Sequence, residues 1–172
     1  MQKVARMTVS ALCLLMASCV FLGAGFAAAL GDIRSRIISN RWVLALVAAA
    51  PLLVIGGHMP PRAFAGSLAL SAVLLLLGAM LFARGWIGGG DVKLICAMVL
   101  WFPPADALWF VYLALVFGGV LALLVLFLRT LARRGVVPVD TDQRQMLDAA
   151  LCVPYAVSIA TAGALVFAFE RF

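Results

Sequence analysis

Two aspartates lie at the margins of long apolar runs, where a charged side chain is costly. Asp32 follows the run Met7–Leu30, and Asp91 precedes the run Val92–Phe102. Ionisable groups beside membrane segments usually serve a function, and two carboxyl groups are the minimum equipment for hydrolysing a peptide bond with an activated water. The sequence therefore indicates Asp32 and Asp91 as a candidate catalytic pair.

Three glycines directly precede Asp91, in the sequence Gly88-Gly89-Gly90-Asp91. Because glycine has no side chain, a second backbone can approach closely at such a segment. We expect Gly88 and Gly90 to admit an extended substrate backbone beside the carboxylate. Lys93 lies two residues beyond Asp91, about 200° around a helix, so it should point away from that carboxylate. It is expected to anchor to lipid headgroups or, alternatively, to orient the Asp91 segment.

Each aspartate also has a simpler interpretation as a charge at a helix end. Asp91 could cap the helix that follows it, and Asp32 could pair with Arg34 or Arg36. For either aspartate alone this interpretation is preferred. The two together, at one expected depth and beside a glycine run, favour catalysis.

The composition is that of an integral membrane protein. Hydrophobic residues make up 66% of the 172 residues and charged residues 12%, and the mean hydropathy is +1.18, so there is too little polar surface to cover a soluble globule. The net charge of +6 comes from basic residues between apolar runs, which indicates membrane orientation and not a nucleic-acid partner. Four cysteines lie in apolar stretches without a Cys-x-x-Cys pair, and we expect no metal, cofactor or disulfide.

The apolar runs predict an all-α polytopic fold. A bilayer core about 30 Å thick requires roughly 20 helical residues. Six spans are expected, at about 7–30, 40–57, 63–83, 91–103, 106–128 and 147–169. The short fourth span should begin near the glycines and end at Pro103-Pro104, which cannot continue a helix. No segment between spans has room for a separate soluble domain, so residues 1–172 are expected to form one transmembrane domain.

The N-terminal run imitates two kinds of processed leader. Lys3 and Arg6 before it and Ala27-Ala28-Ala29 near its end resemble a secretory signal, and Met16-Ala17-Ser18-Cys19 loosely resembles a lipoprotein site. An apolar run of about 24 residues nevertheless suits a retained span better than a signal core of about 7–15.

The distribution of basic residues predicts the orientation. With the N-terminus outside, nine of the thirteen basic residues fall in cytoplasmic segments: Arg34, Arg36, Arg41, Arg84, Lys93, Arg129, Arg133, Arg134 and Arg144. The positive-inside rule then places both termini outside and both aspartates near the cytoplasmic face, at the end of the first span and the start of the fourth. Two neighbouring carboxyls at that depth would share a proton, so that one activates a water while the other protonates the scissile carbonyl.

Several other residues have structural interpretations. Trp42, Trp86, Trp101 and Trp109 are expected to be interfacial anchors at span ends. Pro154 falls within the last predicted span and predicts a kink, and Tyr155 beside it is expected to pack. Asp148 is explained as a charge at a helix N-terminus. With one histidine, His58, and neither a His-Glu-x-x-His nor a Gly-x-Ser-x-Gly sequence, zinc and serine protease chemistry are disfavoured.

The chain resembles a known family over nearly its whole length. The matching residues are Asp32 with Arg34-Ser35-Arg36-Ile37-Ile38-Ser39-Asn40, then Gly88-Gly89-Gly90-Asp91-Val92-Lys93-Leu94, and finally Val153-Pro154-Tyr155. This pattern is similar to that of the small prepilin peptidases of tight-adherence (Flp-type) pilus systems. The family usually has Ile-Pro-Asn where this chain has Ile38-Ser39-Asn40, and Pro-Tyr-Gly where it has Pro154-Tyr155-Ala156. Both departures affect local backbone shape and not the acidic pair.

The resemblance implies a bacterial inner-membrane aspartyl endopeptidase that removes the basic leader of prepilins and pilin-like precursors at the cytoplasmic face, after a glycine. Asp32 and Asp91 would be catalytic, with Gly88, Gly90 and Lys93 completing the motif. N-methyltransferase activity is not expected, since the zinc-bearing cytosolic domain of larger relatives has no counterpart between the first two spans. Two other classes stay open: a small transporter or channel that binds protons or cations at the aspartates, and a non-catalytic component of pilus assembly.

Overall fold

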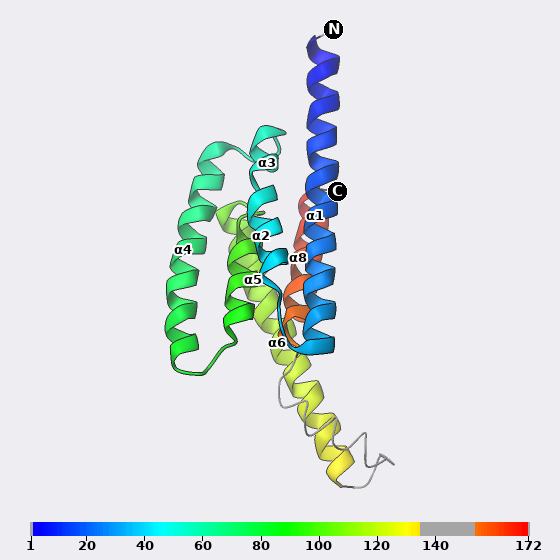
Figure 1. Ribbon diagram of the computed structural model, residues 1–172, viewed down its shortest axis with the longest axis vertical. Helices are drawn as coiled ribbons and strands as arrows, with labels where there is room; N and C mark the ends of the chain where they lie inside the picture. The colour runs from blue at the N-terminus through cyan, green and yellow to red at the C-terminus, as the bar shows by residue number, and fades with distance from the viewer. Residues whose placement is uncertain (1, 135–153, 172) are drawn as a thin grey trace.

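The computed structural model of the protein describes residues 2–134 and 154–171, and these residues form helices and no strand (Figure 1). In chain order the helices are α1 (Gln2–Ser35), α2 (Asn40–Ala49), α3 (Pro51–Ile55), α4 (Pro61–Ala83), α5 (Gly89–Val99), α6 (Pro104–Arg133) and α8 (Tyr155–Arg171). The expectation of an all-α fold is confirmed for this part of the chain.

Three described helices are long and apolar enough to cross a membrane, over Met7–Ser35, Pro61–Ala83 and Pro104–Ala132. Two shorter apolar stretches lie within or overlap predicted spans: Asn40–Ile55 falls within the second, and Tyr155–Glu170 overlaps the described part of the last. The second span is divided because Pro51 lacks the N–H that would continue α2, and α3 begins at that proline. A membrane protein is therefore supported, and the number of six spans stays a prediction.

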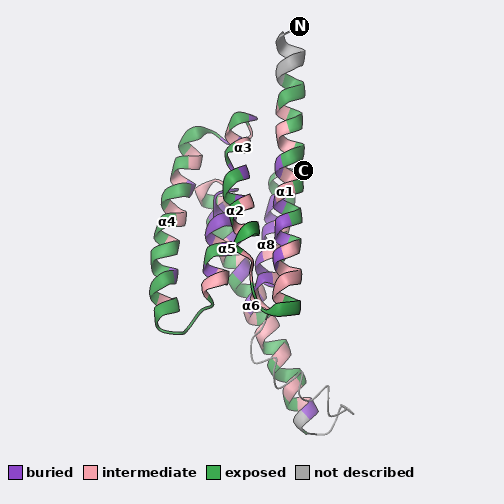
Figure 2. Ribbon diagram, viewed as in Figure 1, coloured by how far each residue is buried: buried purple, intermediate pink, exposed green. Residues whose placement is uncertain are grey.

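Helix α5 occupies the middle of the bundle, packed against α2, α4, α6 and α8. Six of its residues are buried, whereas α4 presents most of its side chains outward (Figure 2). Glycines permit the closest approaches. At Gly78 of α4, for example, a Cβ would lie 2.3 Å from Cγ1 of Val92 on α5. This packing fixes the start of α5 beside the end of α4.

An aromatic cluster forms the centre of the core and includes Trp101. The ring of Phe21 lies 4.9 Å from that of Trp101 and 4.7 Å from that of Phe167. Trp101 is 0% exposed, and its indole N–H donates to the carbonyl of Leu46 at 3.2 Å. The prediction of an interfacial Trp101 is therefore wrong, because this ring faces the bundle. Trp42, Trp86 and Trp109 are exposed.

The turn between α4 and α5 leads directly to the glycine run. After Ala83 the chain makes a Schellman motif, in which Trp86 N–H donates to Leu81 C=O at 3.0 Å and Gly85 N–H donates to Phe82 C=O at 2.9 Å. Gly85 has φ of +73°, which favours glycine. Helix α5 then begins at Gly89, as expected, but ends at Val99, before the proline pair. Pro104 starts α6 instead, at a first-turn position where the absent N–H is not required.

Candidate active site

Asp32 lies in the last turn of α1, at the end of the bundle where α4 turns into α5 (Figure 1). Its side chain is partly buried. One carboxylate oxygen, Oδ2, accepts a hydrogen bond from the backbone N–H of Ala156 at 3.0 Å. Ala156 is the second residue of α8, so the carboxylate sits at the positive end of that helix, where free N–H groups favour a negative charge.

Pro154 precedes α8 and does not kink it. Its carbonyl accepts from Val157 N–H at 3.1 Å, which closes the first turn of the helix. Tyr155 packs tightly on α6, because a Cβ at Gly118 would lie 2.3 Å from its ring. The kink expected within the span 147–169 stays a prediction, because the residues before Pro154 lie outside the described part of the chain. The packing role expected for Tyr155 is confirmed. The contact between Asp32 and Ala156 was not predicted, although the Pro154-Tyr155 motif marked the segment.

Asp91 is the third residue of α5 and is also partly buried. Its carboxylate lies over Gly88, three residues earlier in the chain, since a Cβ at Gly88 would lie 2.7 Å from Oδ2 of Asp91. The backbone of Gly88, with φ −69° and ψ 133°, is available to any residue. The missing side chain therefore leaves room for the chain's own carboxylate.

Asp32 and Asp91 lie at the same end of the bundle, one at the end of α1 and the other at the start of α5 (Figure 1). The segment after α1 helps to hold them there, since a Cβ at Gly90 would lie 3.2 Å from Cβ of Ile38. Gly90 thus lets the loop between α1 and α2 pack on the start of α5. Asp148 lies outside the described residues.

Lys93 points away from this pair, as its helical spacing predicted. It lines a groove between α2, α4 and α5. Within the described residues, no ion pair joins it to either aspartate.

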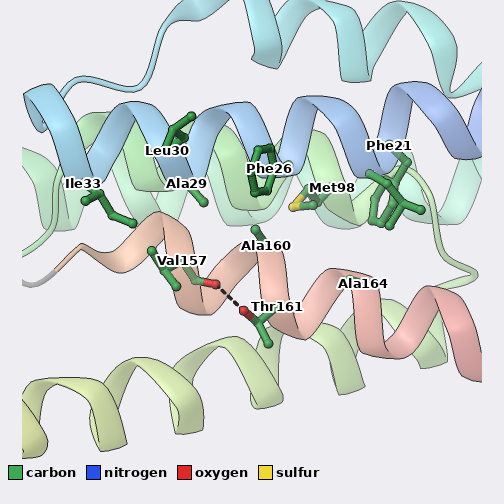
Figure 3. A pocket seen from close by; sticks show the side chains of 12 residues that line it. Phe21, Phe26, Ala29, Leu30, Ile33, Met98, Val157, Ala160, Thr161 and Ala164 are labelled. Atoms are coloured by element: carbon green, nitrogen blue, oxygen red, sulfur yellow. Dashed lines mark hydrogen bonds between the residues drawn. The ribbon is translucent and has the colours of Figure 1, made fainter.

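An open apolar groove of about 510 Å³ extends along α1 and α8 from the end of α1 that carries Asp32 (Figure 3). Ile33 and Val157 line the end of the groove beside Asp32 and Ala156, and Phe21 and Ala164 line its other end. The hydroxyl of Thr161 is already bonded to the carbonyl of Val157 at 2.7 Å. The walls therefore offer apolar contact beside the acidic pair.

Two carboxyls at adjoining helix ends, one of them hydrogen-bonded by a helix N-terminus, can act as a base and an acid on the same reacting group. A search of curated proteins and one of solved structures give no significant match to the chain. A sequence profile described as the type IV leader peptidase family matches residues 19–123, more than half of the chain. Both aspartates and the glycine run lie inside the matched segment. The chain belongs to the type IV leader peptidase family.

Proposed function

We propose that this protein is an intramembrane aspartyl endopeptidase that removes the leader peptide of prepilins and pilin-like precursors, with Asp32 and Asp91 as the catalytic residues. The observation that carries the proposal is that Asp32, in the last turn of α1, and Asp91, in the first turn of α5, lie at the same end of the bundle within the segment that matches the family (Figure 1). The family match does not favour either alternative, the transporter or the non-catalytic component of pilus assembly.

In the proposed first step, Asp32 is the base. Its carboxylate already accepts the Ala156 N–H at the start of α8, which holds it in place. Asp32 takes a proton from a water whose oxygen attacks the scissile carbonyl carbon. Asp91, protonated, donates its proton to the carbonyl oxygen, so that a neutral tetrahedral diol forms.

In the second step the roles reverse. Asp32 gives its proton to the amide nitrogen as the carbon–nitrogen bond breaks, and Asp91 recovers a proton from a hydroxyl of the diol. The products are a carboxylic acid on the leader and an amine on the mature subunit, and both aspartates return to their starting states.

The groove between α1 and α8 supports a substrate that is itself anchored in the membrane. An apolar helical segment lying against Phe26 and Leu30 would bring the residues at its end to Asp32 (Figure 3). Approach of the substrate backbone along Gly88 and Gly90 stays a prediction, because the open sides of these glycines face Asp91 and Ile38.

Direct observation of cleavage tests the proposal. The purified protein is reconstituted in vesicles with a full-length prepilin, and the products are identified by mass spectrometry. We expect one cut after a glycine of the leader, with no methyl group added to the new N-terminus. A preparation that leaves the prepilin intact but conducts protons across the vesicle membrane would favour the transporter.

The backbone N–H of Ala156 provides a sharper test of the roles. Proline at position 156 removes this donor while fitting the first turn of a helix. Because a hydrogen bond to a charged group contributes about 1.5–3 kcal/mol, we expect Ala156→Pro to lower kcat roughly 10- to 100-fold per inserted molecule. Ala156→Gly keeps the N–H and should stay near normal. Equal activities of the two variants would show that the contact does not support catalysis.

The proposed orientation places Asp32 and Asp91 at the cytoplasmic face of the inner membrane, with six spans and both termini outside. Three of the basic segments gather at one end of the bundle: the loop after α1, the turn after α4 and the end of α6 (Figure 1). Single cysteines in a cysteine-free background test this. An impermeant thiol reagent applied to intact cells should label Arg62→Cys, at the start of α4, and spare Ser35→Cys. The reverse pattern would overturn the orientation.

A further inference from the structure

A second groove, of about 340 Å³, lies between α2 and α4 over the surface of α5, and we call it the Lys93 groove. Its walls include Val43 and Val47 of α2 and Leu68 and Leu75 of α4, and its floor includes Leu100, the residue directly after α5. The one polar side chain of the walls besides the lysine is Ser71, whose hydroxyl is bonded to the carbonyl of Cys96 at 2.9 Å. Except at Lys93, the groove therefore offers only apolar contact.

Lys93 supplies the only charge in this lining. The side chain is exposed, and no described acidic side chain lines the groove with it. The neighbouring Val92 packs against Gly78, which places Lys93 level with the last turns of α4. The ammonium thus lies at the end of the groove nearest to the start of α5, which carries Asp91.

The groove between α1 and α8 differs from the Lys93 groove in size and in charge. It is larger but has no charged residue in its lining. A cation at the mouth of an apolar groove suits a molecule with an anionic head and an apolar tail, and basic sites between membrane helices bind anionic headgroups. A zwitterionic lipid gains less from the ammonium, because a cation of its own balances its phosphate, and a neutral helix has no anionic group to place there.

We propose that the Lys93 groove is a binding site for one anionic phospholipid. The phosphate contacts the ammonium of Lys93, and an acyl chain lies between α2 and α4 against Leu68 and Leu100. Because α5 also carries Asp91, two residues before Lys93, the lipid would brace the helix that presents this carboxyl. The site does not depend on the protein being a peptidase.

Photo-crosslinking in vesicles tests this site. The protein is reconstituted in phosphatidylcholine with a small fraction of photoactivatable phosphatidylglycerol or of phosphatidylcholine with the same acyl chains, and labelled peptides are identified by mass spectrometry. One lysine near a membrane surface is worth about a fivefold preference for an anionic lipid, so groove peptides should be labelled about five times more by phosphatidylglycerol. Lys93→Met should remove the preference, and Lys93→Arg should retain it.

Two controls separate a specific site from general surface attraction. Arg84→Met removes a cation from the turn after α4, outside the groove, and should leave the preference intact. Ala72→Phe fills the groove but keeps the lysine, and should abolish acyl-chain labelling there. Equal labelling by both lipids in the native protein, or an unchanged preference in Lys93→Met, would overturn the proposal. Each variant must insert into the membrane normally and elute as a single species. We expect this because Ala72, Arg84 and Lys93 are exposed.

Discussion

Asparagine at position 32 or 91 is expected to abolish leader removal while the protein stays inserted and abundant. An amide keeps the size of the carboxyl group but can neither accept the proton of the water nor cycle as an acid. Loss of a general acid or base costs about 10²–10⁴-fold in rate, so each variant should fall below detection in a processing assay read by immunoblot. Mature pilin appearing at an ordinary rate in either variant would exclude the proposed pair.

Asp106→Asn is the matched control for this experiment. Asp106 lies in the first turn of α6, as Asp91 lies in the first turn of α5, but the length of α5 separates the two. The substitution therefore removes the same charge from the same kind of position at the other end of the bundle. We expect nearly normal processing, and an inactive Asp106 variant would mean that charge at helix starts, and not acid–base chemistry, explains the result.

The placement of the two aspartates at one end of the bundle (Figure 1) could be predicted from the sequence because it depends on depth and on helix order. Apolar runs measured against the bilayer thickness place Asp32 at the end of one helix and Asp91 at the start of another at the same face. In the same way, the angle between successive residues of a helix predicts that Lys93 points away from Asp91. These inferences need only periodicity, which the sequence carries directly.

The predictions that were wrong or not made concern the direction in which a residue faces. Trp101 lies near the end of an apolar run, which suggests an interfacial anchor, but its ring packs on Phe21 inside the bundle. Hydropathy continues across Pro154, so the pattern does not mark the helix start at Tyr155 or the N–H that Ala156 directs to Asp32. Both contacts join segments far apart in the chain, and only tertiary packing specifies them.

Gly88 should be the most sensitive position of the glycine run. A Cβ at this residue would lie 2.7 Å from Oδ2 of Asp91, so alanine must displace the carboxylate. Misplacing a catalytic group by about 1 Å can cost about 100-fold, and we expect Gly88→Ala to lower kcat by roughly 10- to 100-fold. Gly88 is exposed and its backbone angles suit alanine, so the amount of inserted protein should not change.

Gly89→Ala is the comparison that isolates this effect. Its Cβ would lie 3.2 Å from the ring of Phe82, an exposed side chain that can move aside, so we expect nearly normal turnover. The kinetic constants then distinguish two roles for Gly88. If the glycine makes room for the Asp91 carboxylate, alanine lowers kcat with little change in KM, because bound substrate meets a misplaced acid. If it admits the substrate backbone, KM rises instead. Equal kcat and KM values for the two variants would refute both roles and leave the glycine run to helix packing alone.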